Sequence, residues 1–165
     1  MNNLINFITS ELIGKISKEA IVFIISLMPI LELRGGLIAA SLLNVEYFRA
    51  LIICIIGNIL PIPFILLFME KILIWLDSFK PTKKISNMLK NKVEKNKTNI
   101  EKYGYVGLIL FVGIPLPGTG AWTGALIAAI MQLDFKKSLI CIFIGILLAS
   151  IIMSILTYGL LVRVI

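Results

Sequence analysis

The stretch G-I-P-L-P-G-T-G-A-W-T-G, residues 113–124, decides how the rest of the sequence is interpreted. It places two prolines and four glycines between two apolar blocks. Proline removes a helix hydrogen-bond donor and glycine lowers the cost of non-helical backbone, so the stretch predicts a break between two helices. Irregular backbone at membrane depth survives only where protein or water satisfies its N–H and C=O groups, which makes this break a candidate site. The alternative is a short polar turn that joins two ordinary spans.

The composition is that of an integral membrane protein. Of the 165 residues, 59% are hydrophobic, and the mean hydropathy is +1.01, well above the range of soluble proteins. The net charge of +7 arises almost entirely from residues 80–102, which contain eight lysines and two glutamates. Cytoplasmic loops of membrane proteins carry such an excess, so we expect this segment inside the cell and no nucleic-acid partner.

Several kinds of chemistry are disfavoured by the residue inventory. The sequence has no histidine, which removes the commonest metal ligand and general base. Its two cysteines, Cys54 and Cys141, lie in apolar runs, where cysteine packs as a small hydrophobe. We therefore expect no enzyme activity, no catalytic residue, no metal and no cofactor.

Two segments show the pattern of amphipathic helices. Residues 1–18 carry isoleucines and leucines at helical spacing among polar residues, which predicts a helix that lies along the membrane interface. The basic linker, about residues 77–102, shows a similar spacing among its lysines. It is predicted to be an amphipathic helix on the anionic cytoplasmic leaflet, with a solvated loop as the alternative.

A second broken segment precedes the first in the chain. The motif P-I-L-E-L-R-G-G, residues 29–36, lies between two apolar limbs of about a dozen residues each. At 1.5 Å per residue such a limb covers about 18 Å, against roughly 30 Å of hydrocarbon. The two limbs therefore form either one kinked span or a hairpin that enters and leaves on the same side.

Each broken segment is followed by a run long enough to cross the membrane. The first covers residues 48–75 and is expected to bend at Pro61 and Pro63. The second covers residues 136–163, where small and hydroxyl-bearing residues favour close helix packing.

The order of broken segment and long span thus occurs twice, which indicates an internal repeat. F-R-A-L-I-I-C, residues 48–54, aligns with F-K-K-S-L-I-C, residues 135–141, at an offset of about 87. The predicted organisation is one membrane domain, residues 1–165. Its parts are repeat 1 at about 19–76, the linker at about 77–102 and repeat 2 at about 103–165.

The placement of lysines chooses between hairpins and crossing segments. If the broken segments are hairpins, each half crosses the membrane once and the two halves are inverted. The short loop with Lys136 and Lys137 is then cytoplasmic. If the broken segments cross the membrane instead, that loop lies outside, so the positive-inside tendency favours hairpins. The sequence thus predicts an all-α integral membrane fold of two inverted repeats. Each repeat is a re-entrant helical hairpin plus a long transmembrane helix.

Two hairpins entering from opposite faces would meet near the midplane, where inverted-repeat transporters hold substrate. A central Glu or Arg costs about 2.5–3.5 kcal/mol on insertion scales, so Glu32 and Arg34 imply a ligand, water or a mutual ion pair that only fixes the fold. Arg34 offers a forked donor for phosphate or carboxylate, Glu32 is the natural proton carrier, and Thr119 is placed to cap a helix start that favours anions. The predicted substrate- and proton-binding residues are Glu32, Arg34, Pro115, Pro117, Gly118, Thr119, Gly120, Trp122 and, as a weaker candidate, Asn58.

The two motifs together, residues 29–36 and 113–124, resemble the family of small multidrug export proteins, and the resemblance covers nearly the whole chain. That family is similar, more distantly, to the DedA (VTT) superfamily, which implies paired re-entrant hairpins and proton-dependent transport or flipping of lipids, polyprenyl phosphates included. On this resemblance Glu32 and Arg34 would be the membrane-embedded charged residues, and residues 115–120 the opposing loop.

The expected function is that of a small transporter or flippase, linked to protons or another coupling ion, that moves an anionic amphiphile such as a lipid or polyprenyl phosphate. The alternatives are an exporter of cationic drugs, for which Glu32 and Trp122 are the candidate ligands, and a non-transporting membrane scaffold. Expected partners are membrane lipids, with a homo-oligomer left open. The expected location is the cell membrane, as a multi-pass protein.

Overall fold

The computed structural model describes residues 16–78 and 83–159, and every regular element in these ranges is helical. The predicted interfacial helix at residues 1–18 lies almost wholly outside the described residues. The helices are α2 (Lys18–Leu27), α3 (Glu32–Leu42), α4 (Tyr47–Ile59), α5 (Ile62–Ser78), α6 (Lys83–Gly113), α7 (Ala121–Ile130) and α8 (Phe135–Ser154), which continues into the π-helical turn η1 (Ile155–Gly159).

The first broken segment folds back on itself as the hairpin α2–α3. Ser17 is the N-cap of α2, and its side chain accepts a hydrogen bond from the Ala20 N–H at 3.2 Å. The break covers residues 28–31, and the E-L-R-G-G part of the motif forms the start of α3. Its first residue, Glu32, has a φ of 51°, whereas Gly35 and Gly36, which suggested irregular backbone, lie within the helix. The two limbs pack along each other, and both pack on α4.

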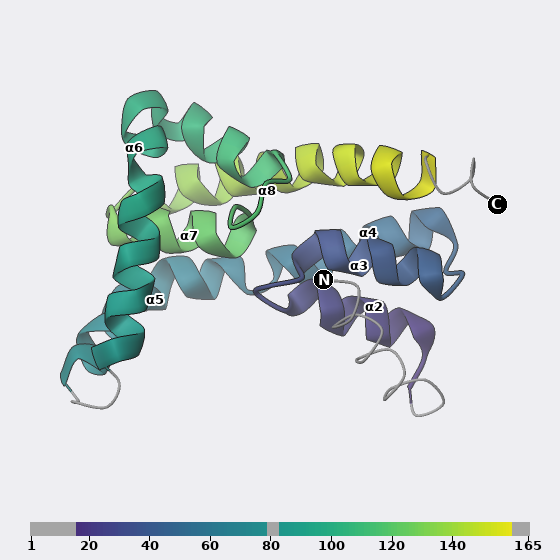
Figure 1. Ribbon diagram of the computed structural model, residues 1–165, viewed down its shortest axis with the longest axis horizontal. Coiled ribbons are helices and arrows are strands. Elements are labelled where there is room, and N and C mark those ends of the chain that lie inside the picture. Colours follow the sequence, from purple (N-terminus) through teal and green to yellow (C-terminus); the bar gives the residue numbers. More distant parts are fainter. Residues whose placement is uncertain (1–15, 79–82, 160–165) are drawn as a thin grey trace.

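The second broken segment has the same form, with the end of α6 and α7 as its limbs. Here the break covers residues 114–120, and the A-W-T-G part of the motif begins α7 four residues earlier than the limb predicted at residue 125. Both limbs pack on α8. In Figure 1 the two hairpins come from opposite ends of the molecule and their breaks lie near its centre.

The long runs are helical as predicted. The first is interrupted at residues 60–61, where Pro61 lacks the N–H that an unbroken helix requires, and it resumes as α5 with Pro63 in its first turn. The second continues through η1 to Gly159, the last described residue. The basic linker is helical from Lys83 within α6; its place on the membrane stays a prediction.

The two halves also share a backbone turn at equivalent positions. Asn44 and Gln132, 88 residues apart, both have φ of 53°. In each turn the next residue donates to the carbonyl five positions back, Val45 to Ala40 and Leu133 to Ala128, both at 2.9 Å, which is the pattern of a Schellman C-cap. An acidic N-cap follows in both halves, Glu46 before α4 and Asp134 before α8. These similar turns and caps lie 88 residues apart, close to the offset of about 87 at which the side chains align.

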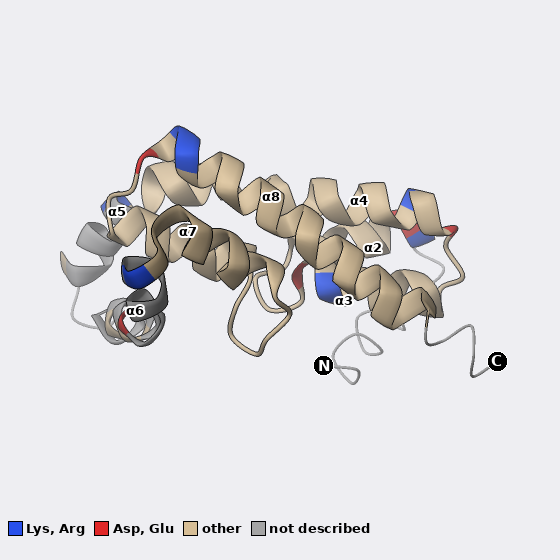
Figure 2. Ribbon diagram, turned by 90° about the horizontal axis from the view of Figure 1, so that it is seen from above, with Lys and Arg blue, Asp and Glu red and all other residues tan. Residues whose placement is uncertain are grey.

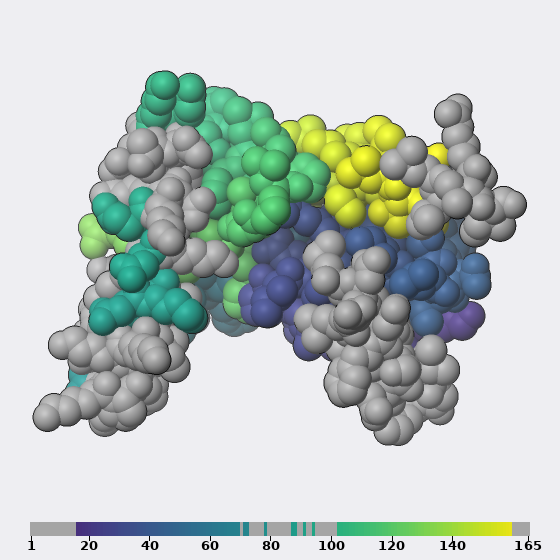
Figure 3. Space-filling view, viewed as in Figure 1, coloured from purple at the N-terminus to yellow at the C-terminus, as the bar shows by residue number. Residues whose placement is uncertain are grey.

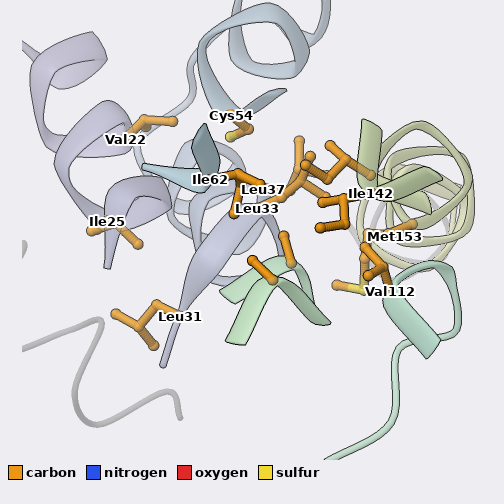
Figure 4. Packing of buried hydrophobic residues seen from close by; sticks show 14 of the residues in the cluster. Val22, Ile25, Leu31, Leu33, Leu37, Cys54, Ile62, Val112, Ile142 and Met153 are labelled. Carbon is orange, nitrogen blue, oxygen red and sulfur yellow. The ribbon is translucent and has the colours of Figure 1, made fainter. Parts of the chain in front are cut away.

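The core lies where the two halves meet. Figure 4 shows buried side chains from both halves pointing into one interior, among them Leu33 and Leu37 of α3 and Ile142 of α8, and α3 packs against α8. In the space-filling view the green surface of the second hairpin meets the purple and blue surface of the first half along the middle of the molecule (Figure 3). The halves form one packed body.

The outer surface is apolar along both long helices. Large hydrophobic side chains are exposed at nearly every fourth residue, at Ile52, Ile56, Leu60 and Phe64 on the first and at Ile140, Ile144, Ile151 and Ile155 on the second. Within the described residues, two helical stretches are long and apolar enough to cross a membrane, Tyr47–Met69 and Phe135–Gly159. Apolar stripes of this length on the outside are typical of lipid-facing helices, so the protein is a membrane protein.

Candidate functional site

The breaks of the two hairpins enclose a pocket of about 360 Å³. This volume is within the range of small-molecule sites. The lining residues come mainly from the two predicted motifs and are Pro29, Ile30, Leu31, Glu32, Arg34, Pro115, Leu116, Pro117, Gly118, Thr119, Thr123 and Met153. The structure therefore brings together six of the nine predicted site residues in one cavity. We call it the central pocket.

Glu32 joins the first hairpin to the start of α7. Its side chain is 6% exposed, and its two carboxylate oxygens accept hydrogen bonds from the N–H groups of Ala121 and Trp122, each at 3.1 Å. These N–H groups belong to the first turn of α7, which has no intrahelical partner for them and carries the positive end of the helix dipole. The carboxylate of one hairpin thus caps a helix of the other.

Arg34 contacts the opposite side of the same break. Its guanidinium donates to the carbonyl oxygens of Leu116 at 2.8 Å and Ile114 at 3.2 Å, and to the Thr119 hydroxyl at 3.1 Å. Ile114 and Leu116 directly follow the C-terminus of α6, where carbonyl oxygens lack helical partners and the dipole is negative. A cation at this end is stabilised for the same reason as the anion at the start of α7.

The two charges of α3 are therefore matched to the two ends of the broken helix. The N–H groups of Ala121 and Trp122 would cost several kcal/mol if left unsatisfied in a membrane, and each charge would be costly there without partners. Figure 2 shows the described charged segments near the two ends of the elongated body, apart from the acidic and basic pair at the start of α3 in its middle. The second hairpin supplies polar partners for both of these charges.

Thr119 has a different role from the predicted one. The N-cap of α7 is Gly120, without a side-chain hydrogen bond, and Glu32 replaces the expected threonine cap. The Thr119 hydroxyl oxygen instead lies 3.0 Å from the Ile114 oxygen and 2.9 Å from the Leu116 oxygen, inside the loop. It connects the loop to Arg34. The first two N–H groups of α7 are consequently occupied rather than open to substrate.

Gly120 allows the close approach of the two hairpins. Its φ is 141°, a region that only glycine adopts readily, and a Cβ there would overlap the Glu32 carboxylate. Gly118, with φ of 84°, faces open space instead. The glycines predicted for the site therefore serve two purposes, contact at Gly120 and turn geometry at Gly118.

The predicted residues Trp122 and Asn58 do not line the pocket. Trp122 binds Glu32 through its backbone while its half-buried ring packs against the core. Asn58 is 3% exposed. Among the described residues, the Trp122 indole nitrogen and the Asn58 amide oxygen are buried without a hydrogen-bond partner.

One lining residue comes from outside the predicted motifs. Met153 belongs to α8 and has no sequence signal beyond its place in an apolar helix, whereas Thr123, in the first turn of α7, is part of the second motif but was not among the predicted site residues. Within the described residues, no group of three or more His, Cys, Asp or Glu side chains is placed to hold a metal ion.

Comparison with known proteins gives one family. Residues 32–152, well over half of the chain, match the family described as "Putative small multi-drug export protein". The matched region begins at Glu32 and includes the first long helix, the second hairpin and most of α8. No curated protein and no solved structure matches the chain.

Proposed function

This chain belongs to the small multi-drug export protein family, and on that premise we propose that it is a multi-pass transporter or flippase of the cell membrane. It moves an anionic amphiphile, such as a lipid or polyprenyl phosphate, through the central pocket. The movement is linked to protons through Glu32.

The membrane arrangement in this proposal is a pair of inverted repeats with re-entrant hairpins. Three contacts support it. The Tyr105 hydroxyl accepts a hydrogen bond from the Asp134 N–H at 3.2 Å, so the second hairpin begins and ends on the same side. Lys137 lies over the Tyr105 ring at 5.9 Å, next to that end. The rings of Tyr47 and Tyr158, 5.0 Å apart, bring the start of α4 beside the end of η1.

These contacts assign opposite directions to the two long helices. One begins near Tyr47 and the other ends there, as the blue and yellow ribbons of Figure 1 illustrate. Each hairpin then returns to the side on which its long helix starts. With the basic linker in the cytoplasm, the second hairpin enters from the cytoplasm and the first from outside.

The proposal of an anionic substrate rests on the position and the hydrogen bonds of Arg34. This residue lines the pocket, and three of its five N–H donors have partners among the described residues. A phosphate or carboxylate that enters the pocket can replace the loop carbonyls as acceptor for Arg34, because a bidentate ion pair between two charged groups is stronger than hydrogen bonds from the guanidinium to neutral carbonyls. Substrate binding would then release the loop at residues 114–119 from Arg34.

Glu32 supplies the proposed proton link. As a carboxylate it accepts from both N–H groups of α7 and complements the helix dipole. Protonation removes the charge and turns one oxygen into a donor, which weakens the cap on α7. A proton and an anionic substrate would therefore loosen the two ends of the same break, and this is the basis for coupling between them.

Export of cationic compounds is the second candidate, favoured by the family description and by the buried acid Glu32. A cation site usually adds aromatic faces to its acid. None of the described residues that line the central pocket is aromatic, and Trp122 is not among them. A non-transporting scaffold is the third candidate, in which Glu32 and Arg34 act only by holding the hairpins together.

One flux experiment separates these functions. The full chain is reconstituted in vesicles with an imposed pH gradient, and a fluorescent lipid phosphate and a cationic dye are followed in parallel. The proposal expects lipid-phosphate movement that depends on the gradient and loses that dependence in Glu32→Gln. Movement of the dye alone would support the cation exporter, and movement of neither above empty vesicles would support the scaffold.

A further inference from the structure

A second pocket of about 340 Å³ lies on the other side of the loop that closes the central pocket. We call it the α6 groove, and its lining residues are Tyr103, Gly107, Leu110, Phe111, Ile114, Leu116, Pro117 and Thr119. Gly107, Leu110 and Phe111 lie at helical spacing in the last part of α6; Tyr103 precedes the kink at Gly104, where φ is 57°, and Ile114 directly follows the helix. Leu116, Pro117 and Thr119 also line the central pocket, so a wall of a few side chains separates the two.

The groove and the central pocket differ in chemistry. The side chains on the α6 face of the groove are apolar or aromatic, with the Tyr103 hydroxyl as the exception, whereas the central pocket contains Glu32 and Arg34. Thr119 belongs to both linings, and its hydroxyl accepts a hydrogen bond from Arg34 at 3.1 Å. The inner end of the groove therefore lies one side chain away from the cation that the central pocket offers.

The outer end of the groove is also basic. The Lys102 ammonium lies 5.2 Å from the centre of the Tyr103 ring, and Tyr103 is 54% exposed. Tyrosine and lysine at one level are typical of the membrane interface, where the ring lies at head-group depth and the amine reaches anionic lipid. The groove thus runs from a basic interfacial position to the basic central pocket along an apolar wall.

From this arrangement we infer that the α6 groove binds the hydrocarbon chain of an amphiphile whose anionic head group occupies the central pocket. The inference rests on the proposed function for the head group, but the groove itself is a separate site. Leu116, Pro117 and Thr119 line both pockets, so release of this loop from Arg34 would let one occupant span the two. The hydrocarbon chain stays in the apolar groove while the anionic head group moves from contact with Lys102 to contact with Arg34.

The test uses the full chain in phosphatidylcholine nanodiscs and a phosphatidic acid whose acyl chain carries a photoactivatable diazirine. Crosslinked positions are mapped by mass spectrometry. We expect labelling of residues 103–119 well above that of the exposed apolar stripe on α4, which reports ordinary lipid contact. Leu110→Trp fills the groove and should lower this labelling about tenfold, the factor expected when two buried methylene contacts are lost.

Val106→Trp is the matched control, because Val106 is exposed on the same helix one turn earlier and does not line the groove. It should leave the labelling unchanged. Ile114→Trp is a second blocking variant, in case Leu110→Trp does not yield folded protein. Labelling of residues 103–119 no higher than that of the α4 stripe, or equal labelling in the blocked and control variants, would overturn the inference.

Two further outcomes separate the groove from the proposed function. Equal groove labelling by phosphatidic acid and by phosphatidylcholine with the same diazirine chain supports the groove and contradicts the preference for an anionic head group. Lipid-phosphate flux that is the same in Leu110→Trp and in Val106→Trp supports the proposed function and overturns the groove as the place of the chain.

Discussion

Glu32 and Ala121 lie 89 positions apart in the chain, yet the Glu32 carboxylate accepts the Ala121 N–H at 3.1 Å and caps the helix that begins there. The cap crosses from the first hairpin to the second. Arg34, two residues further along α3, binds the carbonyl groups at the other end of the same break. A charged pair and a broken helix, each unfavourable alone in a membrane, thereby stabilise each other.

The first prediction concerns the free energy of unfolding. Glu32→Gln keeps the shape of the side chain but replaces one accepting oxygen by a donor, so one buried hydrogen bond to α7 and the charge on its dipole are lost. We expect a loss of about 1.5–3 kcal/mol, the range of hydrogen bonds to charged groups. Thermal unfolding in detergent measures it.

Glu46→Gln is the matched control for this prediction. Glu46 also caps a helix, α4, but its side chain is 57% exposed and water competes with its hydrogen bonds. The same substitution there should cost only a few tenths of a kcal/mol. Equal losses in the two variants would show that the contact between the hairpins adds nothing.

The second prediction separates contact from turn geometry in the break. Gly120→Ala must both strain a backbone that favours glycine and push against the Glu32 carboxylate, whereas Gly118→Ala meets open space and strains only its φ. The strain alone is roughly 1–3 kcal/mol per residue. Gly120→Ala should therefore be clearly the less stable variant by thermal unfolding, and the difference should shrink in a Glu32→Ala background. An unchanged difference in that background would contradict the close approach.

The third prediction tests the equivalence of the halves. Gly57 and Gly145, 88 residues apart, each let the long helix of their half approach the first limb of the hairpin. A Cβ at Gly145 would lie 2.6 Å from the Val112 Cβ, and one at Gly57 would lie 3.0 Å from the Phe23 oxygen. Overpacking costs about 1–3 kcal/mol, against a gain of about 1 kcal/mol in helix propensity.

Gly145→Ala should therefore lower the unfolding temperature, and Gly57→Ala should lower it less. Gly159→Ala serves as the control, because the nearest atom to its Cβ is 3.8 Å away, an ordinary contact. A Gly145→Ala protein as stable as the Gly159→Ala protein would show that the packing of α8 on α6 is looser than described.

Most of the fold could be predicted from the sequence because it depends on local signals. Prolines and glycines in apolar runs marked both breaks, and Pro61 marked the interruption of the first long helix. The starts of α3 and α7 were placed too late, because the glycines of E-L-R-G-G and A-W-T-G indicated irregular backbone. In the structure these glycines lie in helices and allow close packing. A Cβ at Gly36, for example, would overlap Ser26. The turns at Asn44 and Gln132 share a φ of 53° without sharing a residue type, so nothing in the sequence indicated this similarity.

Six of the nine predicted site residues line the central pocket, but the hydrogen bonds between them were not predicted. Glu32 and Arg34 stand out because charge in an apolar run is costly, and the loop residues stand out as proline and glycine. Their partners could not be read from the sequence, because hydrogen bonds between the hairpins join residues more than eighty positions apart. Thr119 has the residue type of a helix cap, but a carboxylate from the other hairpin holds that position.

The fourth prediction tests the inverted arrangement in the membrane. Arg49 and Lys137 lie 88 residues apart, and both are exposed near the start of a long helix. In a background with Cys54 and Cys141 replaced by alanine, Arg49→Cys should react with a membrane-impermeant maleimide on intact cells. Lys137→Cys should react only after permeabilisation. Reaction of both from the same side would contradict inversion.

The central claim is that Arg34 holds an anionic head group between the two hairpins, and lipid-phosphate flux in vesicles tests it most directly. Arg34→Gln removes the charge and the fork, and Arg49→Gln removes an exposed arginine away from the pocket. We predict that Arg34→Gln, purified as a folded protein, loses lipid-phosphate flux by about tenfold or more, the factor that corresponds to one charge-assisted hydrogen bond. Arg49→Gln should keep the wild-type rate. A folded Arg34→Gln protein with the wild-type rate would contradict the claim.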